Sequence, residues 1–431
     1  MDFVYILFCR GHKKNGRGAF MMHNPAVKAS EAKQQAAKKK TRQEYAAQIA
    51  LLKRRDDYIS QYDYFLEMLS LHAEPEKFRQ KVMRPVAALN CLQAPPEIFD
   101  ALGFVPYRFC SNALSRQDIA ASRLPALACP IIKSCLSSFL LDDSIESQAE
   151  LAIIAGTCDW MVRLPELLEG QGKNIHIMEL PHIKESERGR KRWIEEIYQL
   201  KDFLERQSGQ KMSRQNLRLS IQKYAAARLA LRNLLEARER KEISALWCLV
   251  MTNAFLMGDV EGWTKSVNEV LRMQSGKFCS PGTSVFLAGS PVMFPNLKIP
   301  QLLEDAGIHV AADELCTSER ILAGVPLSED NSEFALLRAL AEQSHLGCSC
   351  PTYADNKRRL NNIMAIMRDR NISGLVLHIL KGCHPYDICS FQMEQTLREN
   401  GFHFLRIETD QSREDSKSLL LRLEAFSAVI Q

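Results

Sequence analysis

The residues best suited to chemistry are three cysteines that follow apolar segments of the chain. Cys110 follows residues 104–109, Cys158 follows residues 151–156 and Cys383 follows residues 375–380. In parallel α/β folds, ligands bind beyond the carboxyl ends of the strands. A thiol at such a position meets free backbone N–H groups, whereas a structural cysteine is expected inside a strand or helix. The sequence therefore predicts a sulfur-ligated site at the strand ends.

A fourth cysteine extends this pattern. Cys129 precedes Pro130 and lies 19 residues after Cys110, and Cys383-His384-Pro385 lies far downstream. Three thiolates from separate loops can hold three irons of a [4Fe–4S] cluster and leave the fourth iron open to water or substrate. The spacing is not that of a compact ferredoxin motif, so three unrelated buried thiols remain the alternative.

The elements that must position these thiols alternate between strands and helices. Strands are predicted at residues 104–109, 151–155, 175–178, 285–288, 308–311, 375–380 and 404–408, with helices at 299–306, 356–370, 391–400 and 416–430. Continuous apolar strands between helices are typical of parallel sheets covered on both faces. The predicted fold class is α/β, with two Rossmann-like parallel-sheet domains.

Two regions of the chain differ from this alternation and divide it into four parts. Residues 183–275 contain almost no Gly or Pro and predict about four helices, with Ser213 as an N-cap. Residues 23–84 are polar and helical in pattern. We therefore predict a basic tail and helical arm over 1–85, a first α/β domain with the cluster ligands over 86–182, a helical connector over 183–280 and a second α/β domain over 281–431.

Several segments occur in the order found in one known family. They include LPALACPIIKSCLSS from Leu124, AGTCDW from Ala155, VFLAGSPV from Val285, LGCSCPTYADNKRRLNNIMAIM from Leu346 and SGLVLHILKGCHPYDI from Ser373. Over roughly residues 86–428 the chain resembles the 2-hydroxyacyl-CoA dehydratase and benzoyl-CoA reductase family of iron–sulfur proteins. The resemblance implies a [4Fe–4S] cluster held by Cys110, Cys129 and Cys383.

The resemblance also implies a reaction and its partners. A separate ATP-dependent iron–sulfur activator would supply one electron at low potential, and the thioester carbonyl of an acyl-CoA substrate would become a ketyl radical that expels the neighbouring hydroxyl. The chain has no Gly-x-x-x-x-Gly-Lys motif, so ATP hydrolysis must come from another protein. The resemblance further implies a related second subunit or a homodimer.

Three polar residues beside these cysteines are candidate catalytic residues. Ser111 and Ser137 could donate to sulfur or to a carbonyl oxygen, and His384 could donate to cluster sulfur or to the substrate. Helix caps and turns use serine equally often, and a satisfied loop histidine is an equal alternative. Ser134, Ser138 and Glu408 are weaker candidates of the same kind.

A branch of the family that carries a double-cubane [8Fe–9S] cluster provides a second interpretation. The pair Cys348 and Cys350, together with Cys158, are the candidate extra ligands. The protein would then be a reductase of small molecules driven by an ATPase activator. A non-catalytic, cluster-bearing partner subunit is the third possibility.

The remaining cysteines have no such sequence context. The chain contains 13 cysteines, and a disulfide scaffold is excluded because a chain of 431 residues can build its own core. We expect structural or incidental roles for Cys9, Cys91, Cys248, Cys279, Cys316 and Cys389. For Cys135 and Cys389 this expectation is weaker, because both lie close to a ligand loop.

Composition and charge exclude other classes of protein. No stretch reaches the roughly 18 apolar residues of a membrane-spanning helix, and the apolar run at 3–9 follows an acid rather than the base of a secretory signal. We therefore expect a cytoplasmic protein. Residues 1–54 contain 12 basic and 3 acidic residues, whereas the rest of the chain carries a net charge of −4. We interpret this basic tail as a solvated leader and expect no nucleic-acid partner.

Overall fold

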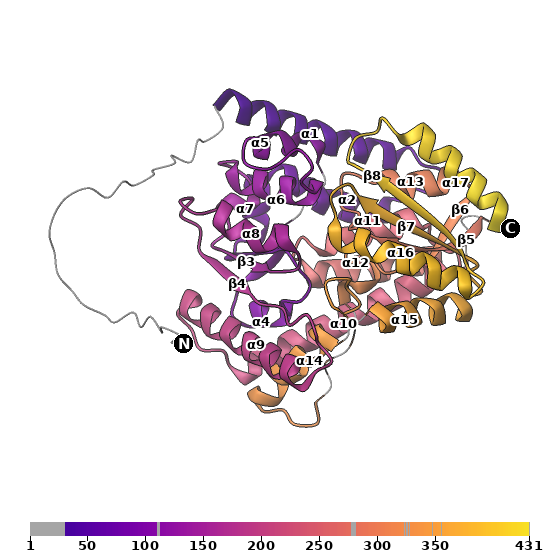
Figure 1. The fold of residues 1–431 in the computed structure, drawn as a ribbon. Helices are drawn as coiled ribbons and strands as arrows, with labels where there is room; N and C mark the ends of the chain where they lie inside the picture. Colours follow the sequence, from indigo (N-terminus) through magenta and orange to yellow (C-terminus); the bar gives the residue numbers. More distant parts are fainter. Residues whose placement is uncertain are drawn as a thin grey trace, which may run out of the picture.

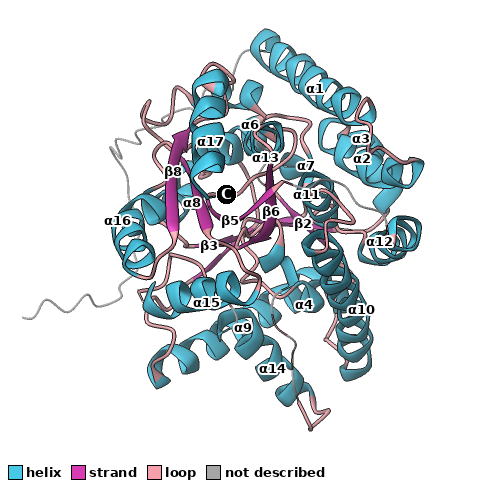
Figure 2. Cartoon of the chain, turned by 90° about the vertical axis from the view of Figure 1, so that its right-hand side faces the viewer, coloured by secondary structure: helices cyan, strands magenta, loops and turns pink. Residues whose placement is uncertain are grey.

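The computed structural model describes residues 31–109, 113–276, 282–322, 324, 326, 328–346, 348–354 and 356–430. It contains two parallel sheets that lie side by side, with helices around each of them (Figure 1). Figure 2 shows the strands at the centre of the molecule and the helices on the outside. The predicted α/β class with two Rossmann-like domains is confirmed.

The first sheet is formed by four short strands near the N-terminal side of the chain. They are β1 (Val86–Leu89), β2 (Val105–Arg108), β3 (Leu151–Ala155) and β4 (Ile175–Met178). All pair in parallel in the order β2-β1-β3-β4. Its helices are α4 (Pro96–Ala101), α5 (Gln117–Ala120), α6 (Pro130–Leu140), α7 (Ile145–Gln148) and α8 (Asp159–Leu167). Every residue of β1, β2 and β3 is buried, as expected for strands covered on both faces.

The second sheet repeats this strand order. Its strands are β5 (Thr283–Gly289), β6 (Ile308–Asp313), β7 (Gly374–Leu380) and β8 (His403–Thr409), all parallel in the order β6-β5-β7-β8. Its helices are α13 (Lys298–Asp305), α14 (Glu333–Leu346), α15 (Asn356–Asp369), α16 (His384–Glu399) and α17 (Ser416–Ile430). The order reverses between β1 and β3 and between β5 and β7. In such sheets, ligands bind at the carboxyl ends of the strands beside this reversal.

Four helices connect the two sheets. They are α9 (Glu187–Ser208), α10 (Arg214–Glu239), α11 (Ala245–Phe255) and α12 (Val260–Gln274). Ser213 caps α10 as predicted, because its side chain accepts a hydrogen bond from the Asn216 N–H. Every residue of α11 is buried. This helix is therefore part of the core rather than a solvated linker.

The N-terminal arm ties the two halves together. It contains α1 (Glu31–Lys53), α2 (Asp63–Ser70) and α3 (Pro75–Val82), and α1 runs along both halves in Figure 1. The Thr41 and Ser115 hydroxyls are hydrogen-bonded at 2.9 Å on the side of the first sheet. The Tyr45 ring packs edge-on against Phe294 on the other side, with 5.2 Å between centroids. Among the described residues, no helix combines the length and the apolar character needed to span a membrane.

Candidate cysteine-lined site

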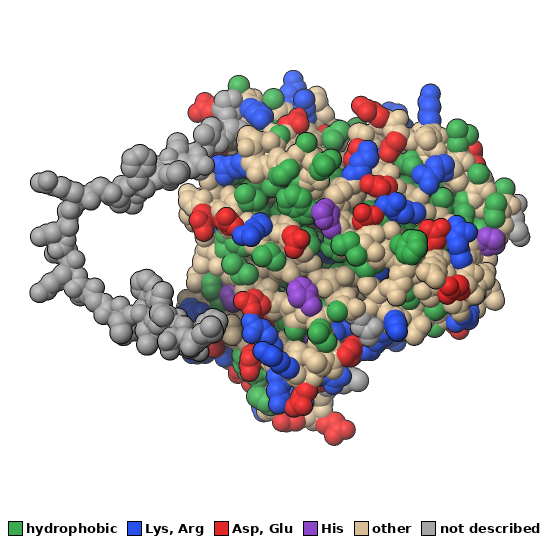
Figure 3. Space-filling model, viewed as in Figure 1, with side chains coloured by type: hydrophobic (Ala, Val, Ile, Leu, Met, Phe, Trp, Pro, Cys, Tyr) green, Lys and Arg blue, Asp and Glu red, His purple; other side chains and the backbone are tan. Residues whose placement is uncertain are grey.

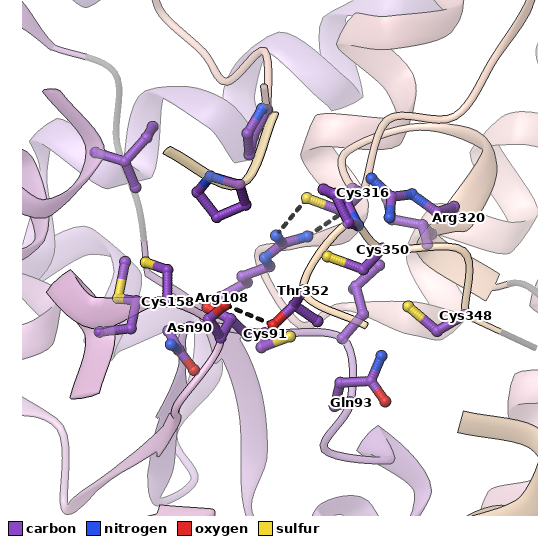
Figure 4. A pocket seen from close by; sticks show the side chains of 18 of the residues that line it. Asn90, Cys91, Gln93, Arg108, Cys158, Cys316, Arg320, Cys348, Cys350 and Thr352 are labelled. Carbon is purple, nitrogen blue, oxygen red and sulfur yellow. Dashed lines mark hydrogen bonds between the residues drawn. The ribbon is translucent and has the colours of Figure 1, made fainter. Parts of the chain in front are cut away.

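A cavity lies where the carboxyl ends of both sheets face each other. Its walls include Asn90 after β1, Thr157 after β3 and Pro291 after β5. The space between its largely apolar walls is about 1420 Å³, including the part open to solvent. Seven cysteines line it: Cys91, Cys129, Cys158, Cys316, Cys348, Cys350 and Cys383. Both domains and the connector contribute to one site, part of which is seen in Figure 4.

Three of these cysteines occupy the N-cap positions of helices, and we name them the N-cap group. Cys129 precedes α6, Cys158 precedes α8 and Cys383 precedes α16. Backbone N–H groups of the first turn act to lower the pKa of each thiol, such as that of Ile131 at Cys129 and that of Tyr386 at Cys383. These N–H groups have no partner within the helix, and the helix dipole is positive here. These N–H groups favour the thiolate, the form that binds iron, but the bond to Cys383 and burial raise the pKa of Cys129, and burial raises that of Cys158.

Two members of the N-cap group share a hydrogen bond. The bond from the Cys129 thiol lowers the pKa of Cys383 to about 7, and the Ser290 hydroxyl adds to this effect. The same bond, together with burial, raises the pKa of Cys129. Cys383 is therefore the thiolate of the pair, and Cys129 carries the proton when no metal is bound.

Gly382 allows these two cysteine loops to approach each other. Its φ of 78° lies in the left-handed region, and a Cβ atom at this position would lie 2.4 Å from the Leu127 carbonyl oxygen. Such a separation is far below contact distance, so only glycine fits. The Trp160 indole N–H donates to the Gly382 carbonyl at 3.4 Å and brings α8 to the same place. These two contacts hold the three elements of the N-cap group together.

The other four cysteines, Cys91, Cys316, Cys348 and Cys350, lie near cationic side chains, and we name them the arginine-side group. The Arg108 guanidinium donates to the Cys316 sulfur at 3.0 Å and also to its carbonyl oxygen. Burial raises the pKa of Cys350 to about 12, while the nearby Arg320 acts in the opposite direction. Figure 4 shows Cys316 and Cys350 near Arg320, with Cys348 and Cys91 lower in the view.

The residues that line the cavity fit an iron–sulfur group in their chemistry. Within the described ranges, no group of three His, Cys, Asp or Glu side chains lies close enough to hold one metal ion. A cubane is wider than an ion and takes thiolates that are farther apart, from separate loops. The buried Arg320 also has Nε and Nη1 atoms without a hydrogen-bond partner. Soft thiols, an apolar lining and unpaired cationic donors all fit an anionic iron–sulfur group.

The structure brings most of the predicted ligands together on this cavity. Cys129, Cys158, Cys348, Cys350 and Cys383 all line it. The predicted ligand Cys110 and the candidate Ser111 lie outside the described residues. Cys91 and Cys316, for which we expected no functional role, are also on its wall. In the sequence, the signal for Cys91 was the short apolar run 86–89 before it.

The predicted polar residues lie elsewhere. Ser137 is buried and its hydroxyl accepts from the Ala120 N–H at 3.0 Å, which joins α5 to α6. His384 is exposed at the start of α16, with its ring edge toward Trp160 at 6.4 Å between centroids. Ser138 accepts from Arg116 at 2.7 Å, and Glu408 on β8 pairs with Arg406 at 3.1 Å. The hydroxyl beside a thiol is instead that of Ser290, which sequence analysis did not single out.

Comparison with known proteins identifies a family whose sequence model matches most of the chain. The sequence model of a family described as "2-hydroxyglutaryl-CoA dehydratase, D-component" matches residues 91–430. The "Putative dehydratase subunit YjiM" of Escherichia coli (strain K12) is 24% identical over 355 residues, which cover 79% of this chain and 90% of that protein. The "(R)-phenyllactyl-CoA dehydratase beta subunit" of Clostridium sporogenes is 23% identical over 382 residues, 85% of this chain and 98% of that protein.

Proposed function

The chain belongs to the 2-hydroxyglutaryl-CoA dehydratase D-component family, and we propose that it is the iron–sulfur subunit of a dehydratase that removes water from a 2-hydroxyacyl-CoA. The observation that carries this proposal is the convergence of seven cysteines on one cavity at the strand ends of both sheets. Structural cysteines scattered through a core would not meet in this way. The names of both relatives contain the word dehydratase, which supports the reaction class.

We assign the ligands of a [4Fe–4S] cluster to Cys129 and Cys383, with Cys110 as the third from the sequence pattern. When bound, such a cluster would pass on the low-potential electron that starts the elimination of water. The chain's own residues hold the thiolates in place. The N–H groups in the first turns of α6 and α16 favour the thiolate form, and the Ser290 hydroxyl donates to Cys383. The largely apolar walls exclude water, which would quench a radical.

The proposal includes two protein partners. The electron comes from an ATP-dependent iron–sulfur activator, because the sequence has no phosphate-binding loop of its own. A second subunit completes the enzyme, since both relatives are named as subunits. Free thiols in such number suit the reducing cytoplasm, where we place the protein.

Metal analysis of the anaerobically purified chain tests the proposal. We expect about four irons and an equal amount of sulfide per chain, as in one cubane. Cys383→Ala should lose most of this iron because it removes a proposed ligand whose pKa is lowered to about 7. Cys248→Ala is the matched control, since Cys248 is buried in the core away from the cavity lining and should keep full iron. A wild-type chain that folds without iron would contradict the proposal and favour a non-catalytic partner subunit.

The arginine-side group favours a second candidate, a double-cubane [8Fe–9S] reductase of small molecules. Cys91, Cys316, Cys348 and Cys350 supply enough thiols for a second cubane on the same cavity. About eight irons per chain would then be found. In that case Cys350→Ala should lose about half of the iron, whereas a single cubane on the N-cap group would lose none.

A further inference from the structure

One tyrosine on the wall of the cavity belongs to the same helical turn as a proposed cluster ligand. Tyr386 lies in the first turn of α16, and its backbone N–H acts on the Cys383 thiol at the start of that helix. Its side chain is only 6% exposed and lines the cavity. The backbone of Tyr386 therefore serves the thiol, and its hydroxyl is available for a different role.

The Tyr386 hydroxyl accepts one hydrogen bond and still has a hydrogen to donate. The Arg320 guanidinium donates to the phenol oxygen at 2.7 Å, and this bond is buried. A phenol can accept and donate at the same time. In the part of the chain that the structure describes, no group accepts the hydrogen of this hydroxyl. Burial raises the pKa of Tyr386 above its ordinary range, so the hydrogen is retained.

Arg320 is a buried cation that pairs with no carboxylate among the described residues. It is 8% exposed, and its Nε and Nη1 atoms have no hydrogen-bond partner. Glu314, whose charge acts on Arg320, is itself held by Arg359 in two hydrogen bonds. Buried charges normally have partners, because an isolated charge is costly to remove from water. Uncompensated positive charge next to the Tyr386 hydroxyl points to a ligand on which negative charge develops.

The surroundings of this hydroxyl are largely apolar. The cavity walls have few polar groups, and Figure 3 shows hydrophobic side chains gathered near the centre of the face that carries α8 and α16 in Figure 1. The Arg359 guanidinium lies 5.5 Å from the centre of the Tyr386 ring and helps to hold it in place. A hydrogen bond in such surroundings is stronger than in water, and a fixed donor needs no reorganisation when charge appears.

We propose that the Tyr386 hydroxyl donates a hydrogen bond to the thioester carbonyl oxygen of the substrate, and that Arg320 polarises this hydroxyl. The proposal rests on the proposed function, because it assigns the residue that meets the oxygen where charge develops. One electron from the activator enters the C=O bond and leaves a negative charge on the oxygen. No bond breaks and no proton moves in this step. Tyr386 is then a catalytic residue, and Arg320 is a positioning residue.

Two other acceptors fit this hydroxyl less well. Sulfur is a weak acceptor, and among the described residues no cysteine accepts from Tyr386, although the charges of Cys316 and Cys350 act on it. The leaving hydroxyl of the substrate needs a whole proton, whereas burial keeps the proton on Tyr386. A carbonyl oxygen needs only a hydrogen bond, which becomes stronger as the oxygen gains charge.

Infrared difference spectroscopy of the bound carbonyl tests this proposal. The probe is 2-hydroxybutyryl-CoA with a ¹³C label at the thioester carbonyl, added to the anaerobically purified full-length chain with its iron. A hydrogen bond lowers the stretching frequency of a carbonyl, so we expect a frequency below that of the free thioester. In Tyr386→Phe this shift should be lost, while the dissociation constant should rise only severalfold, because a hydrogen bond to an uncharged oxygen contributes little.

Kinetics of the complete enzyme, assembled with its activator and second subunit, provide a second measurement. Tyr386→Phe should lower kcat about a hundredfold or more and raise KM only severalfold, as expected when one donor to a developing oxyanion is lost. Arg320→Met should reduce the infrared shift without abolishing it, because the hydroxyl remains but is no longer polarised. A full shift in Arg320→Met would overturn the role of Arg320.

Tyr353→Phe is the matched control. Tyr353 is 3% exposed, its hydroxyl is hydrogen-bonded to the His345 ring at 3.3 Å, and the Lys184 ammonium lies 4.8 Å from the centre of its ring. It resembles Tyr386 in burial and in its nearby cation, but it is not part of the cavity lining. This variant should keep both the infrared shift and kcat.

The outcomes separate this proposal from the proposed function. An unchanged carbonyl frequency in Tyr386→Phe would overturn the proposal and leave the function standing. A changed electron paramagnetic resonance spectrum of the cluster, with the carbonyl frequency unchanged, would overturn it in favour of a hydrogen bond to the cluster. A wild-type chain that binds no 2-hydroxyacyl thioester would contradict the function itself, and this proposal with it.

Discussion

At the scale of single residues, the site uses two different ways to stabilise sulfur. Cys129, Cys158 and Cys383 lie at helix N-termini, where backbone N–H groups act to lower the pKa of each thiol. Cys316 and Cys350 instead lie near guanidinium groups, as in the bond from Arg108 to the Cys316 sulfur at 3.0 Å. Backbone donors are fixed by the fold, whereas side-chain cations can move. The N-cap group is therefore the more preorganised of the two.

Ser290→Ala should raise the pKa of the Cys383 thiol. The Ser290 hydroxyl donates to this sulfur and is one of the groups that lower the pKa of Cys383 to about 7. Without it, less thiolate is present at pH 7, and a rise of about one pH unit in the pKa reduces the thiolate fraction about fivefold. The alkylation rate of Cys383 in the metal-free protein, followed by mass spectrometry of its peptide, should fall by a similar factor.

Ser134→Ala serves as the control for this measurement. Ser134 is a buried serine of α6, whose hydroxyl has no hydrogen-bond partner within the described residues. Its removal should leave the rate at Cys383 unchanged. Equal rates in wild-type protein and Ser290→Ala would mean that the hydroxyl has no influence on the thiolate.

At the scale of elements, the two halves of the molecule present cysteine in equivalent places. Cys158 follows β3 and begins α8, and Cys383 follows β7 and begins α16. β3 and β7 are the third strands of their sheets and lie beside the reversal of strand order. The same strand, turn and helix unit therefore delivers a thiol from each side of the cavity.

The sequence predicts most of these elements, and the differences have local causes. Seven strands follow from their apolar runs, but β1 was not predicted, because Val86-Ala87-Ala88-Leu89 contains two alanines and β-branched residues are the better strand formers. The position of Cys91 at a strand end was missed for the same reason. The prediction started the α16 helix at Phe391, whereas the structure starts it at His384, since proline is favoured in the first turn of a helix.

The site itself could be predicted only in part. The sequence points to Cys158 and Cys383, because the fold class alone places each of them at the carboxyl edge of its own sheet. The way in which the two domains face each other depends on the connector. No local sequence pattern encodes that arrangement. The hydrogen bond from Arg108 to the Cys316 sulfur is a contact between these domains, and it joins residues 208 positions apart in the sequence.

Tyr45→Ala in the arm should destabilise the protein by about 3–5 kcal/mol, as for other large aromatic residues truncated in a core. Tyr45 is buried on α1 and its ring packs against Phe294 beyond β5. The free energy of unfolding in urea measures this loss. Leu51→Ala on the same helix removes a side chain that is about half exposed and should cost much less. Similar losses for both variants would show that the arm is held by helix propensity rather than by this contact.

At the scale of the whole molecule, the cavity depends on how two similar domains are held. One continuous core includes Tyr45 of the arm, Ile154 of the first sheet, Trp247 of the connector and Leu287 of the second sheet. Trp247 stacks on Tyr62 at 3.9 Å between centroids, which joins the connector to the arm. Because the site lies between the domains, loosening of this common core should open the site before either sheet unfolds.

Buried histidines are distributed through this architecture. Burial lowers the pKa of His72 to about 3 and those of His309, His345 and His378 to about 4. His72 joins the arm to the first sheet, since its ring nitrogen is hydrogen-bonded to the Tyr107 hydroxyl at 2.7 Å. In the unfolded chain a histidine has a pKa of about 6.5. Below that pH the unfolded state takes up protons that the folded state does not bind.

Stability should therefore fall as the pH is lowered from about 6.5 toward 4. Each of the four histidines contributes a loss of at most about 1.4 kcal/mol per pH unit in this window, and none above it. We expect the urea midpoint of the metal-free protein to drop clearly between pH 7 and pH 5.

His309→Gln should weaken this pH dependence, because glutamine can donate to the Arg238 carbonyl in place of the histidine without taking up a proton. His403→Gln, at an exposed position, is the control and should leave the pH dependence unchanged. A midpoint that stays constant over this range would mean that these histidines are protonated in the folded protein, and hence that the domains do not enclose them as tightly as their burial indicates.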